Sequence, residues 1–318
     1  MLSAAAQAAG AQDFPPGALY VVATPIGNLA DITLRAVHTL ALVDAVACED
    51  TRQSAHLLTA LGLHKPLLAV HEHNEREGAQ KVVERLQRGE RVAYISDAGT
   101  PAVSDPGAAL VQAVRDAGCR CLPLPGASSA LAALSVAGDV SKRGFRFIGF
   151  LPAKGSERAT ALHAAVMDAC SVVLFESTHR VEALAAELAR ACPARLLTVA
   201  RELTKQFEAV QTLAAGEWPA WLAADPNRRR GEFVLVLHGT VTGPSAAPQA
   251  TGPGSPGHAQ PSTPEEQAAH RVLAILLQDL PVKQAATLGA EISGLPKKRL
   301  YQWALDLKDA QGEGVADA

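Results

Sequence analysis

Four short segments of this chain combine glycine or proline with small polar side chains, and residues of these types can enclose a small ligand. Glycine and proline fix tight turns and let a ligand approach the backbone, while hydroxyl and carboxylate groups supply hydrogen bonds. Each segment follows an apolar run that predicts a strand, and the four are Thr24–Asn28, Glu49–Arg52, Ser96–Pro101 and Pro125–Ser129. Any one of them is also compatible with an ordinary strand-to-helix turn. Together, at one edge of a sheet, they predict a binding pocket.

The sequence around these segments lacks the commonest nucleotide-binding motifs. No GxGxxG sequence follows the first predicted strand, and the phosphate-binding sequence GxxxxGK followed by Ser or Thr does not occur in the chain. We therefore expect a small polar ligand without a pyrophosphate group. Metal binding is not expected, because His71 and His73 have no companion cluster of ligands nearby in the sequence.

The elements that must position these segments follow from the hydrophobic pattern. From Leu19 onward, short apolar runs alternate with longer segments of helical period, which predicts an α/β fold with parallel strands flanked by helices. One helix has clear limits, because Asp105 can cap it, Pro106 can be its first residue, and Gly118 ends it after residues 108–117. Strands are expected in two sets, which are Leu19–Thr24, Asp44–Cys48, Arg91–Ser96 and Arg120–Leu124, then Phe145–Phe150, Ser171–Phe175, Arg195–Ala200 and Phe233–Leu237.

These two sets predict two lobes, residues 18–136 and residues 137–240, with a hinge at Ser135–Arg143. Residues 1–17 are expected to be a disordered tail. The two lobes would together form a two-lobed α/β protein.

A separate, smaller part is expected after the second lobe. Residues 241–264 are dominated by glycine, proline, serine and threonine, which is the composition of a linker. A small helical module over residues 265–310 and a tail over residues 311–318 follow. The module is expected to be helix-turn-helix-like, with helices at Glu265–Asp279, Val282–Gly294 and Leu295–Leu307.

The overall composition limits the classes of function. Hydrophobic residues make up 48% of the 318 residues and charged residues 19%, so most of the chain can form apolar cores. The formal net charge of −3 disfavours a protein that coats nucleic acid, so any RNA contact must be local. Five cysteines without a CxxC pair disfavour a disulfide framework or a zinc module. With no signal peptide and no long apolar run, we expect a soluble, cytoplasmic protein with no membrane partner.

One twelve-residue segment identifies a family. Residues 96–107, Ser-Asp-Ala-Gly-Thr-Pro-Ala-Val-Ser-Asp-Pro-Gly, closely resemble the signature of the bacterial ribosomal RNA small subunit methyltransferase I family, which has the tetrapyrrole-methylase fold. Shorter motifs agree in order over roughly residues 19–239, and these are Ala23–Asn28, Cys48–Arg52, His73–Glu75, Pro125–Ser129, Glu176–Arg180, Arg201–Lys205 and Gly231–Phe233.

This resemblance implies a two-lobed enzyme, usually a homodimer, that binds S-adenosylmethionine between its lobes. The implied substrate is small-subunit (16S) ribosomal RNA or the assembled small subunit, methylated at the ribose 2′-oxygen of one cytidine. Enzymes of this fold that act on porphyrins and corrins often carry a GxGxG loop after the first strand, whereas this chain has Thr24–Asn28 there. A tetrapyrrole or diphthine methylase of the same fold is the alternative enzyme. A non-catalytic ribosome-assembly factor is the alternative outside catalysis.

Under this resemblance, turn amides and short polar side chains of the first lobe would hold the methyl donor, together with two carboxylates of the second lobe. The expected contacts are Pro25, Ile26, Gly27, Asp97, Gly99, Thr100, Ser104, Asp105, Ser128, Ser129, Glu176 and Glu232. For Asp105 a helix cap, and for the two glutamates a structural role, are the alternatives.

A ribose hydroxyl is a weak nucleophile at neutral pH, so one group should accept its proton or stabilise the developing oxyanion. Lys205 and Glu202 are the candidates for this catalytic role. Burial beside Arg201 would lower the pKa of Lys205 enough to make it a base. A contact to an RNA phosphate, or a solvated charge, is the alternative for Lys205. Further candidates for the base are Glu208, Asp50 and His73.

Basic and polar side chains outside the turns are expected to contact RNA, although short basic runs are usually only solvated. They are Arg52, His73, Asn74, Arg76, Arg201, Arg228, Arg229, Arg230, Lys297, Lys298 and Arg299. The last three begin the final predicted helix, where phosphates would meet side-chain charge and free amides. Because residues 265–309 carry no net charge, protein docking or dimer stabilisation is an equal alternative for this module.

Overall fold

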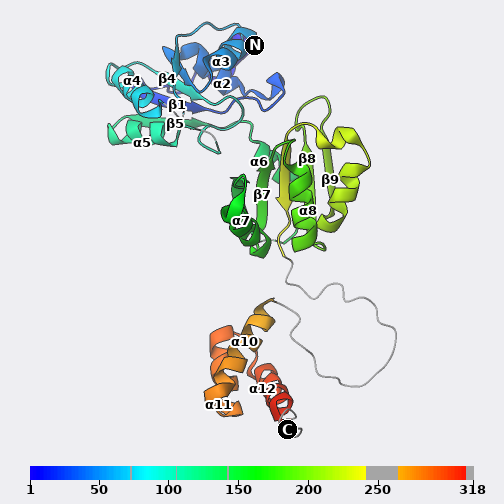
Figure 1. The fold of residues 1–318 in the computed structure, drawn as a ribbon. Helices are drawn as coiled ribbons and strands as arrows, with labels where there is room; N and C mark the ends of the chain where they lie inside the picture. Colours follow the sequence, from blue (N-terminus) through cyan, green and yellow to red (C-terminus); the bar gives the residue numbers. More distant parts are fainter. Residues whose placement is uncertain (72–73, 105, 142, 241–263, 313–318) are drawn as a thin grey trace. The chain divides into compact units, whose positions relative to one another are not determined.

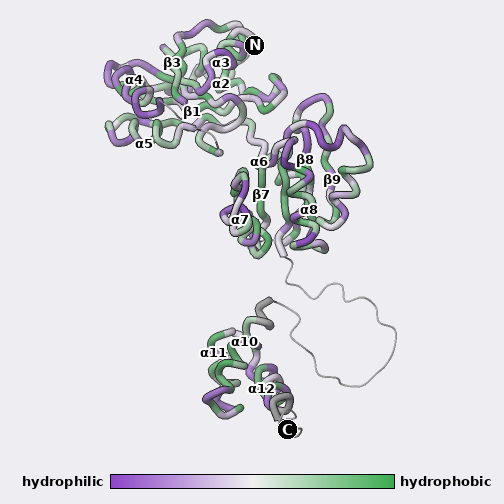
Figure 2. Tube along the Cα trace, in the orientation of Figure 1, coloured by the Kyte–Doolittle hydropathy of each residue, from purple (hydrophilic) through white to green (hydrophobic). Residues whose placement is uncertain are grey.

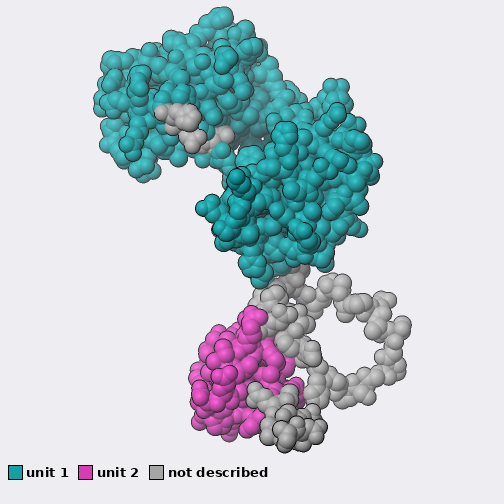
Figure 3. All heavy atoms as spheres, in the orientation of Figure 1, with its two compact units in different colours: residues 1–241 teal, residues 242–318 magenta. Residues whose placement is uncertain are grey.

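The computed structural model describes residues 1–71, 74–104, 106–141, 143–240 and 264–312. The chain divides into two compact units, Met1–Val241 and Thr242–Ala318, which are coloured separately in Figure 3. The expected linker lies outside the described residues except for residue 264. Of the expected C-terminal tail, residues 311 and 312 belong to the last helix and the remainder lies outside the described residues.

The first sheet has five parallel strands in the order β3-β2-β4-β1-β5. Figure 1 labels three of them, β4, β1 and β5. The four strands expected here are present, which confirms the parallel first sheet. Strand β3 was not expected, because three partly exposed residues form too short an apolar run. The strands are β1 (Ala18–Val22), β2 (Ala45–Cys48), β3 (Leu67–Ala69), β4 (Val92–Ile95) and β5 (Arg120–Leu124).

Helices cover both faces of the first sheet. One face carries α2 (Leu34–Leu42) and α3 (Thr51–Ala60), and the other carries α4 (Glu75–Gln87) and α5 (Ala108–Asp116). Helix α4 is largely hydrophilic (Figure 2) and buries only one stripe of apolar residues, as a helix between core and solvent does. A short 3₁₀ turn, η1 (Leu29–Asp31), precedes α2.

The expectation of a disordered tail over residues 1–17 is wrong in part. Helix α1 (Leu2–Ala9) forms there and packs against α2, with Ala5 and Ala9 buried. Alanine has the highest helix propensity, so an alanine-rich stretch that meets an apolar surface becomes a helix.

The start of α5 also differs from the expectation. Its first residue is Ala108 and its N-cap is Gly107, so Pro106 precedes the helix, and Asp105 lies outside the described residues. The Tyr94 hydroxyl donates to the Pro106 carbonyl at 2.8 Å, and the Gly107 amide donates to Glu75 at 3.1 Å. These bonds hold the turn against β4 and α4. The other end agrees with the prediction, because Gly118 adopts a positive φ of 73° just after the helix.

The second sheet is mixed, with the strand order β6-β7-β10-β8-β9. Only β6 and β7 are parallel, whereas β10 runs antiparallel to both β7 and β8, and β9 is antiparallel to β8. The expectation of parallel strands therefore fails for most of this sheet. The strands are β6 (Phe145–Phe150), β7 (Ser171–Glu176), β8 (Leu196–Arg201), β9 (Ala209–Ala214) and β10 (Phe233–Leu237).

Helix α6 (Ser129–Ala137) packs on one face of the second sheet, against Val173, Ala200 and Val236. The second lobe therefore begins near residue 129, and the expected hinge at Ser135–Arg143 overlaps the end of this helix. The opposite face carries α7 (Gly155–Met167), α8 (Val181–Ala191), η2 (Ala215–Glu217) and α9 (Trp218–Ala223), and η3 (Pro226–Arg229) follows.

The second unit is three helices around their own core. Helices α10 (Pro264–Asp279), α11 (Val282–Ser293) and α12 (Lys297–Gly312) match the expected helix-turn-helix-like module, and Gly294 in the left-handed region ends α11. Leu273, Leu300 and Trp303 are buried between them. Among the described residues, no helix is both long and apolar enough to cross a bilayer.

Candidate functional site

The loops after β1, β4 and β5 lie together, as the sequence predicted. Thr24 and Gly99 exchange backbone hydrogen bonds of 2.9 and 3.1 Å, and the Thr100 hydroxyl donates to the Ala127 carbonyl at 3.1 Å. The loop after β2 joins them, because the Asp50 amide donates to Asp97 at 3.2 Å. Parallel strands place all these loops at the same edge of the sheet.

A cavity of about 270 Å³ lies where these loops face the second lobe. This volume is close to the lower end of the range for small-ligand sites, about 300–1,000 Å³. Seven of the expected donor contacts line it, and these are Ile26, Gly99, Thr100, Ser128, Ser129, Glu176 and Glu232. Its other lining residues are Ala98, Val103, Phe150, Phe175, Ser177, Leu203, Phe233 and Val234.

Four expected donor contacts do not line this cavity, and three of them have other contacts in the structure. Asp97 accepts hydrogen bonds from the Asp50 amide and from Gln53, so it orders the neighbouring loop, and burial raises its pKa. At Gly27 a β-carbon would lie 2.5 Å from Lys205 Cγ, so the missing side chain lets the two lobes approach. Gly149 of β6 has the same role toward Ser104, because a β-carbon at Gly149 would overlap the Ser104 hydroxyl. Pro25 is the fourth, and Asp105 lies outside the described residues.

An aromatic wall is the part of the cavity that sequence reasoning missed. Phe150 is 54% exposed although it ends a strand, and its ring meets that of Phe175 at 5.6 Å in an edge-to-face arrangement. The register between β6 and β7 shifts between Phe147 and Gly149, which re-aims the end of β6. The Phe-x-Phe-x-Gly-Phe pattern indicated only a core strand, because nothing in it signals that shift.

Antiparallel pairing assembles the second-lobe side of the site. Phe233 at the start of β10 pairs with Glu176 at the end of β7 and with Arg201 at the end of β8. Three segments far apart in the sequence, 176–177, 201–205 and 231–233, therefore meet beside the cavity. Sequence reasoning selected residues in all three segments but had no means to place them together.

Two loops at the cavity contain strained backbone. Among the described residues, the non-glycine residues with positive φ are Ala102, Ser104, Glu202 and Thr204. They flank Val103 and Leu203, which both line the cavity. Such backbone costs about 1–3 kcal/mol per residue and concentrates at ligand sites, which agrees with a ligand site at this cavity.

The two catalytic candidates form a charged cluster with Glu232. Lys205 Nζ lies 3.1 Å from Glu202 Oε1 and 3.1 Å from Glu232 Oε2. Burial lowers the pKa of Lys205, but the hydrogen bonds and charges of the two glutamates outweigh it and raise the pKa above its usual value. The expected lowering is therefore contradicted, and Lys205 stays an ammonium.

Glu202 is also a weak base. Burial raises the pKa of Glu202, but hydrogen bonds from the Glu232 amide and from Lys205 outweigh it and lower the pKa. Glu208 accepts a hydrogen bond from the Thr204 amide, and Asp50 caps α3 through the Arg52 amide at 2.7 Å. His73, the remaining candidate for the base, lies outside the described residues.

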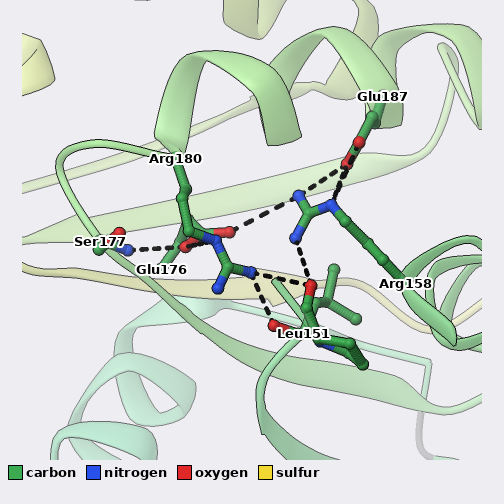
Figure 4. A network of polar contacts seen from close by, with 7 residues as sticks. Leu151, Arg158, Glu176, Ser177, Arg180 and Glu187 are labelled. Atoms are coloured by element: carbon green, nitrogen blue, oxygen red, sulfur yellow. Dashed lines mark hydrogen bonds and ion pairs between the residues drawn. The ribbon is translucent and has the colours of Figure 1, made fainter. Parts of the chain in front are cut away.

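Glu176 is the most buried acid of the cavity, and it belongs to a network of ion pairs (Figure 4). Its side chain is 0% exposed, with Oε1 3.1 Å from Arg180 Nε and 2.8 Å from the Ser177 amide. Its Oε2 lies 3.8 Å from Arg158 and has no hydrogen-bond partner among the described residues. Arg158 in turn binds Glu187 at 2.8 Å. Both the structural role and a ligand contact expected for Glu176 are thus compatible with its position.

Several residues expected to contact RNA have partners inside the protein. Arg228 stacks on Trp221 at 4.7 Å, and Arg229 pairs with Glu182 at 3.0 Å. Arg201 donates to the carbonyls of Arg230 and Phe207. Asn74 and Arg299 are also held, the former in its own loop and the latter by Glu266 at 2.6 Å.

The other residues expected to contact RNA are exposed, and these are Arg52, Arg76, Arg230, Lys297 and Lys298. His73 lies outside the described residues. Within the part of the chain that the structure describes, no group of three His, Cys, Asp or Glu residues could hold a metal ion.

Comparison with known proteins matches both units to described families. Residues 18–218 match the family described as Tetrapyrrole (Corrin/Porphyrin) Methylases, and residues 263–308 match the RsmI C-terminal HTH domain. Among solved structures, diphthine synthase gives a TM-score of 0.55 at 17% identity, covering 70% of this chain and 91% of that one. The methyltransferase CobJ gives 0.53 at 22% identity, covering 72% and 96%. At these identities the likeness concerns the fold.

Curated relatives are much closer in sequence. The chain is 46% identical to Ribosomal RNA small subunit methyltransferase I of Neisseria meningitidis serogroup A over 293 residues, covering 92% of this chain and 94% of the relative. The protein of the same name from Escherichia coli O157:H7 is 43% identical, with 92% and 96% covered. That from Pseudomonas aeruginosa is 46% identical, with 91% and 97% covered. This chain therefore belongs to the ribosomal RNA small subunit methyltransferase I family, on the tetrapyrrole-methylase fold.

Proposed function

We propose that this protein is an S-adenosylmethionine-dependent methyltransferase that modifies the ribose 2′-oxygen of a cytidine in small-subunit ribosomal RNA. The observation that carries the proposal is the cavity in which loops of a parallel sheet meet an aromatic and acidic wall. The close relatives named for small-subunit ribosomal RNA support this substrate over a porphyrin, a corrin or diphthine. We further propose that the protein acts as a homodimer in the cytoplasm, where ribosomal subunits are assembled.

The cavity fits the chemical parts of the donor. Phe150 and Phe175 offer apolar faces for an adenine ring and attract a cation such as a sulfonium. The unbonded Oε2 of Glu176 and the exposed carboxylate of Glu232 suit a positively charged amino group. Ser128 and Ser129, at the start of α6, add hydroxyls and helix amides.

S-adenosylmethionine, when bound, supplies a methyl group activated for in-line displacement by an oxygen nucleophile. The residues of this chain then have mainly to orient the two reactants and to exclude water. Ile26, Val103 and Leu203 provide the apolar enclosure from both lobes. No side chain is required as a nucleophile.

We infer that Lys205 acts as a fixed positive charge rather than as a base. Its ammonium, held by Glu202 and Glu232 next to the cavity, suits the stabilisation of a developing oxyanion or of an RNA phosphate. Because its pKa is raised, loss of the proton should not limit the rate at neutral or mildly alkaline pH. A Lys205→Arg variant should keep more activity than Lys205→Ala.

The direct test supplies purified protein with methyl-labelled donor and either small subunits or protein-free ribosomal RNA. We expect label in RNA, at a cytidine that becomes resistant to alkaline cleavage on its 3′ side. Label on a tetrapyrrole or on a protein would favour the alternative enzymes, and donor binding without transfer would favour an assembly factor. Sedimentation of the full chain tests the homodimer.

A matched pair of variants tests the cavity itself. Phe150→Ala removes part of the aromatic wall, and Phe207→Ala removes a side chain of the same lobe that is 66% exposed and does not line the cavity. We expect the donor Kd, measured by calorimetry, to rise about 10- to 50-fold for Phe150→Ala, the equivalent of about 1.4–2.3 kcal/mol. Phe207→Ala should change it less than twofold. Equal effects of the two variants would place the donor elsewhere.

A further inference from the structure

A second cavity in the second lobe is lined by cations that are scattered along the sequence. It has a volume of about 540 Å³ and lies between the loop after β6, the start of α7 and the exposed side of α8. Lys154, Arg158, Arg180 and Arg190 line it, and Glu187 is its one acidic lining residue.

The positive charge in this cavity is only partly neutralised. Arg158 is 8% exposed and holds Glu187 with both Nε and its terminal nitrogen, at 3.2 and 2.8 Å. Arg180 forms an ion pair with Glu176, which does not line this cavity, at 3.1 Å. For Lys154 and Arg190, both exposed, no ion pair forms among the described residues. Two cations thus remain available to an anion, next to two that are rigidly held.

The backbone adds to this preference for an anion. Lys154 is the N-cap of α7 and its side chain makes no capping bond, so the first amides of this 13-residue helix are not capped by it. Gly155 lines the cavity with a positive φ of 83°. Uncapped amides and the helix dipole both favour negative charge at this point.

The second cavity shares a network of ion pairs with the donor cavity. Glu176 lines the donor cavity, while Arg158 and Arg180 line the second one. Figure 4 shows the ion pairs that join these three residues. Arg180 also donates to the Leu151 carbonyl at 2.7 Å, one residue after Phe150 of the aromatic wall. An anion in the second cavity would therefore contact the same arginines that hold Glu176 of the donor cavity.

We propose that this second cavity binds a backbone phosphodiester of the RNA substrate. The proposal rests on the proposed function, because it takes the polyanion to be the RNA that is methylated. Arg158 and Arg180, which carboxylates hold in place, offer hydrogen-bond donors at fixed positions. The exposed Lys154 and Arg190 supply the positive charge that a phosphate neutralises.

The test uses the full chain with Lys154→Ala and Arg190→Ala combined. Its control combines Arg115→Ala and Arg120→Ala, two exposed arginines of the first lobe, in the last turn of α5 and at the start of β5. We expect the Kd for ribosomal RNA to rise about 10- to 50-fold at 0.1 M salt for the first pair only. The steepness of log affinity against log salt should fall by about 0.7–0.9, the value for one lost phosphate contact. The donor Kd should stay within twofold.

Three outcomes are decisive. If the first pair matches the control in Kd and salt slope, the cavity does not hold RNA. If the Lys154→Ala, Arg190→Ala double variant loses the inorganic phosphate binding of the wild type but keeps its RNA affinity, the site takes free phosphate and the proposal is overturned. If wild-type protein transfers no methyl group to RNA, the proposed function fails instead. A urea unfolding midpoint equal to that of the wild type would show that the double variant folds normally.

Discussion

The two lobes of the first unit contribute to one cavity in different ways. In the first lobe, five parallel strands deliver their loops to one edge, and backbone contacts such as those between Thr24 and Gly99 hold the loops. In the second lobe, an antiparallel strand brings together distant segments, and ion pairs around Glu176 and Lys205 hold them. The first arrangement depends on backbone shape and the second on charge. Each should therefore fail under a different kind of substitution.

The largest effect is expected from removing the buried charge of the second lobe. Glu176→Gln leaves Arg180 without its carboxylate and removes the more distant of the two carboxylates around Arg158, in a place where the glutamate side chain is 0% exposed. We expect the free energy of unfolding to fall by about 3–5 kcal/mol. Glu232→Gln, at a side chain that is 80% exposed, should cost at most about 1 kcal/mol. Urea unfolding measures both, and equal losses would contradict the role of burial.

A single added methyl group should disturb the first lobe. Gly107 has a φ of 122°, and a β-carbon there would overlap the Tyr94 ring. We expect Gly107→Ala to cost about 2–4 kcal/mol, from strain and overpacking together. Gly118→Ala has a similar strain, with a φ of 73° but open space around it, and should cost about 1 kcal/mol. If thermal or urea unfolding gives the same loss for both, packing against Tyr94 does not hold this turn.

Acid should weaken the second lobe through Asp139, which lies between α6 and β6. Burial raises the pKa of Asp139, but hydrogen bonds from Ser171, Gly239 and Ser141 outweigh it and hold the pKa at about 2. Because the pKa is lowered on folding, this stabilisation is complete above the ordinary pKa and is lost as the pH falls from about 5 to about 2. Since the side chain is partly exposed, we expect about 1–2 kcal/mol.

The measurement compares urea unfolding of wild type and Asp139→Asn between pH 7 and pH 2. The difference in stability should be largest at neutral pH and should shrink over that interval. Asp116→Asn, at an exposed position of α5, serves as the control and should show no such convergence. A difference for Asp139→Asn that is independent of pH would show that its charge is not responsible.

The sequence was sufficient for most of the fold and for the first-lobe half of the site. Apolar runs located eight of the ten strands, and topology placed the four turns at one edge. The missed strands have physical reasons, because β3 has only three residues and β9 is a partly exposed strand at the edge of its sheet. Glu176 and Glu232, which were selected from short polar motifs, both line the cavity.

What the sequence could not provide was pairing across long distances. The approach of β10 to β7 and β8 decides which groups surround Lys205, and those groups reverse the expected direction of its pKa shift. The basic second cavity was also missed, since its four cations are spread over residues 154–190 and form no run. Conversely, the Arg228–Arg230 run was conspicuous in sequence but is partly used inside the lobe.

The smallest prediction separates the arginines of that run. Arg228 donates to the Trp221 carbonyl at 2.9 Å and covers its ring, so Arg228→Ala should cost about 1 kcal/mol of stability. Arg230 is exposed, so Arg230→Ala should cost less than about 0.5 kcal/mol. If the run contacts phosphate, RNA affinity should show the opposite order. Arg230→Ala should then weaken RNA binding more than Arg228→Ala, because only the Arg230 side chain is exposed. Parallel losses in unfolding and RNA-binding measurements would instead mean that the run acts as one surface, and that internal pairing does not decide which charges reach the substrate.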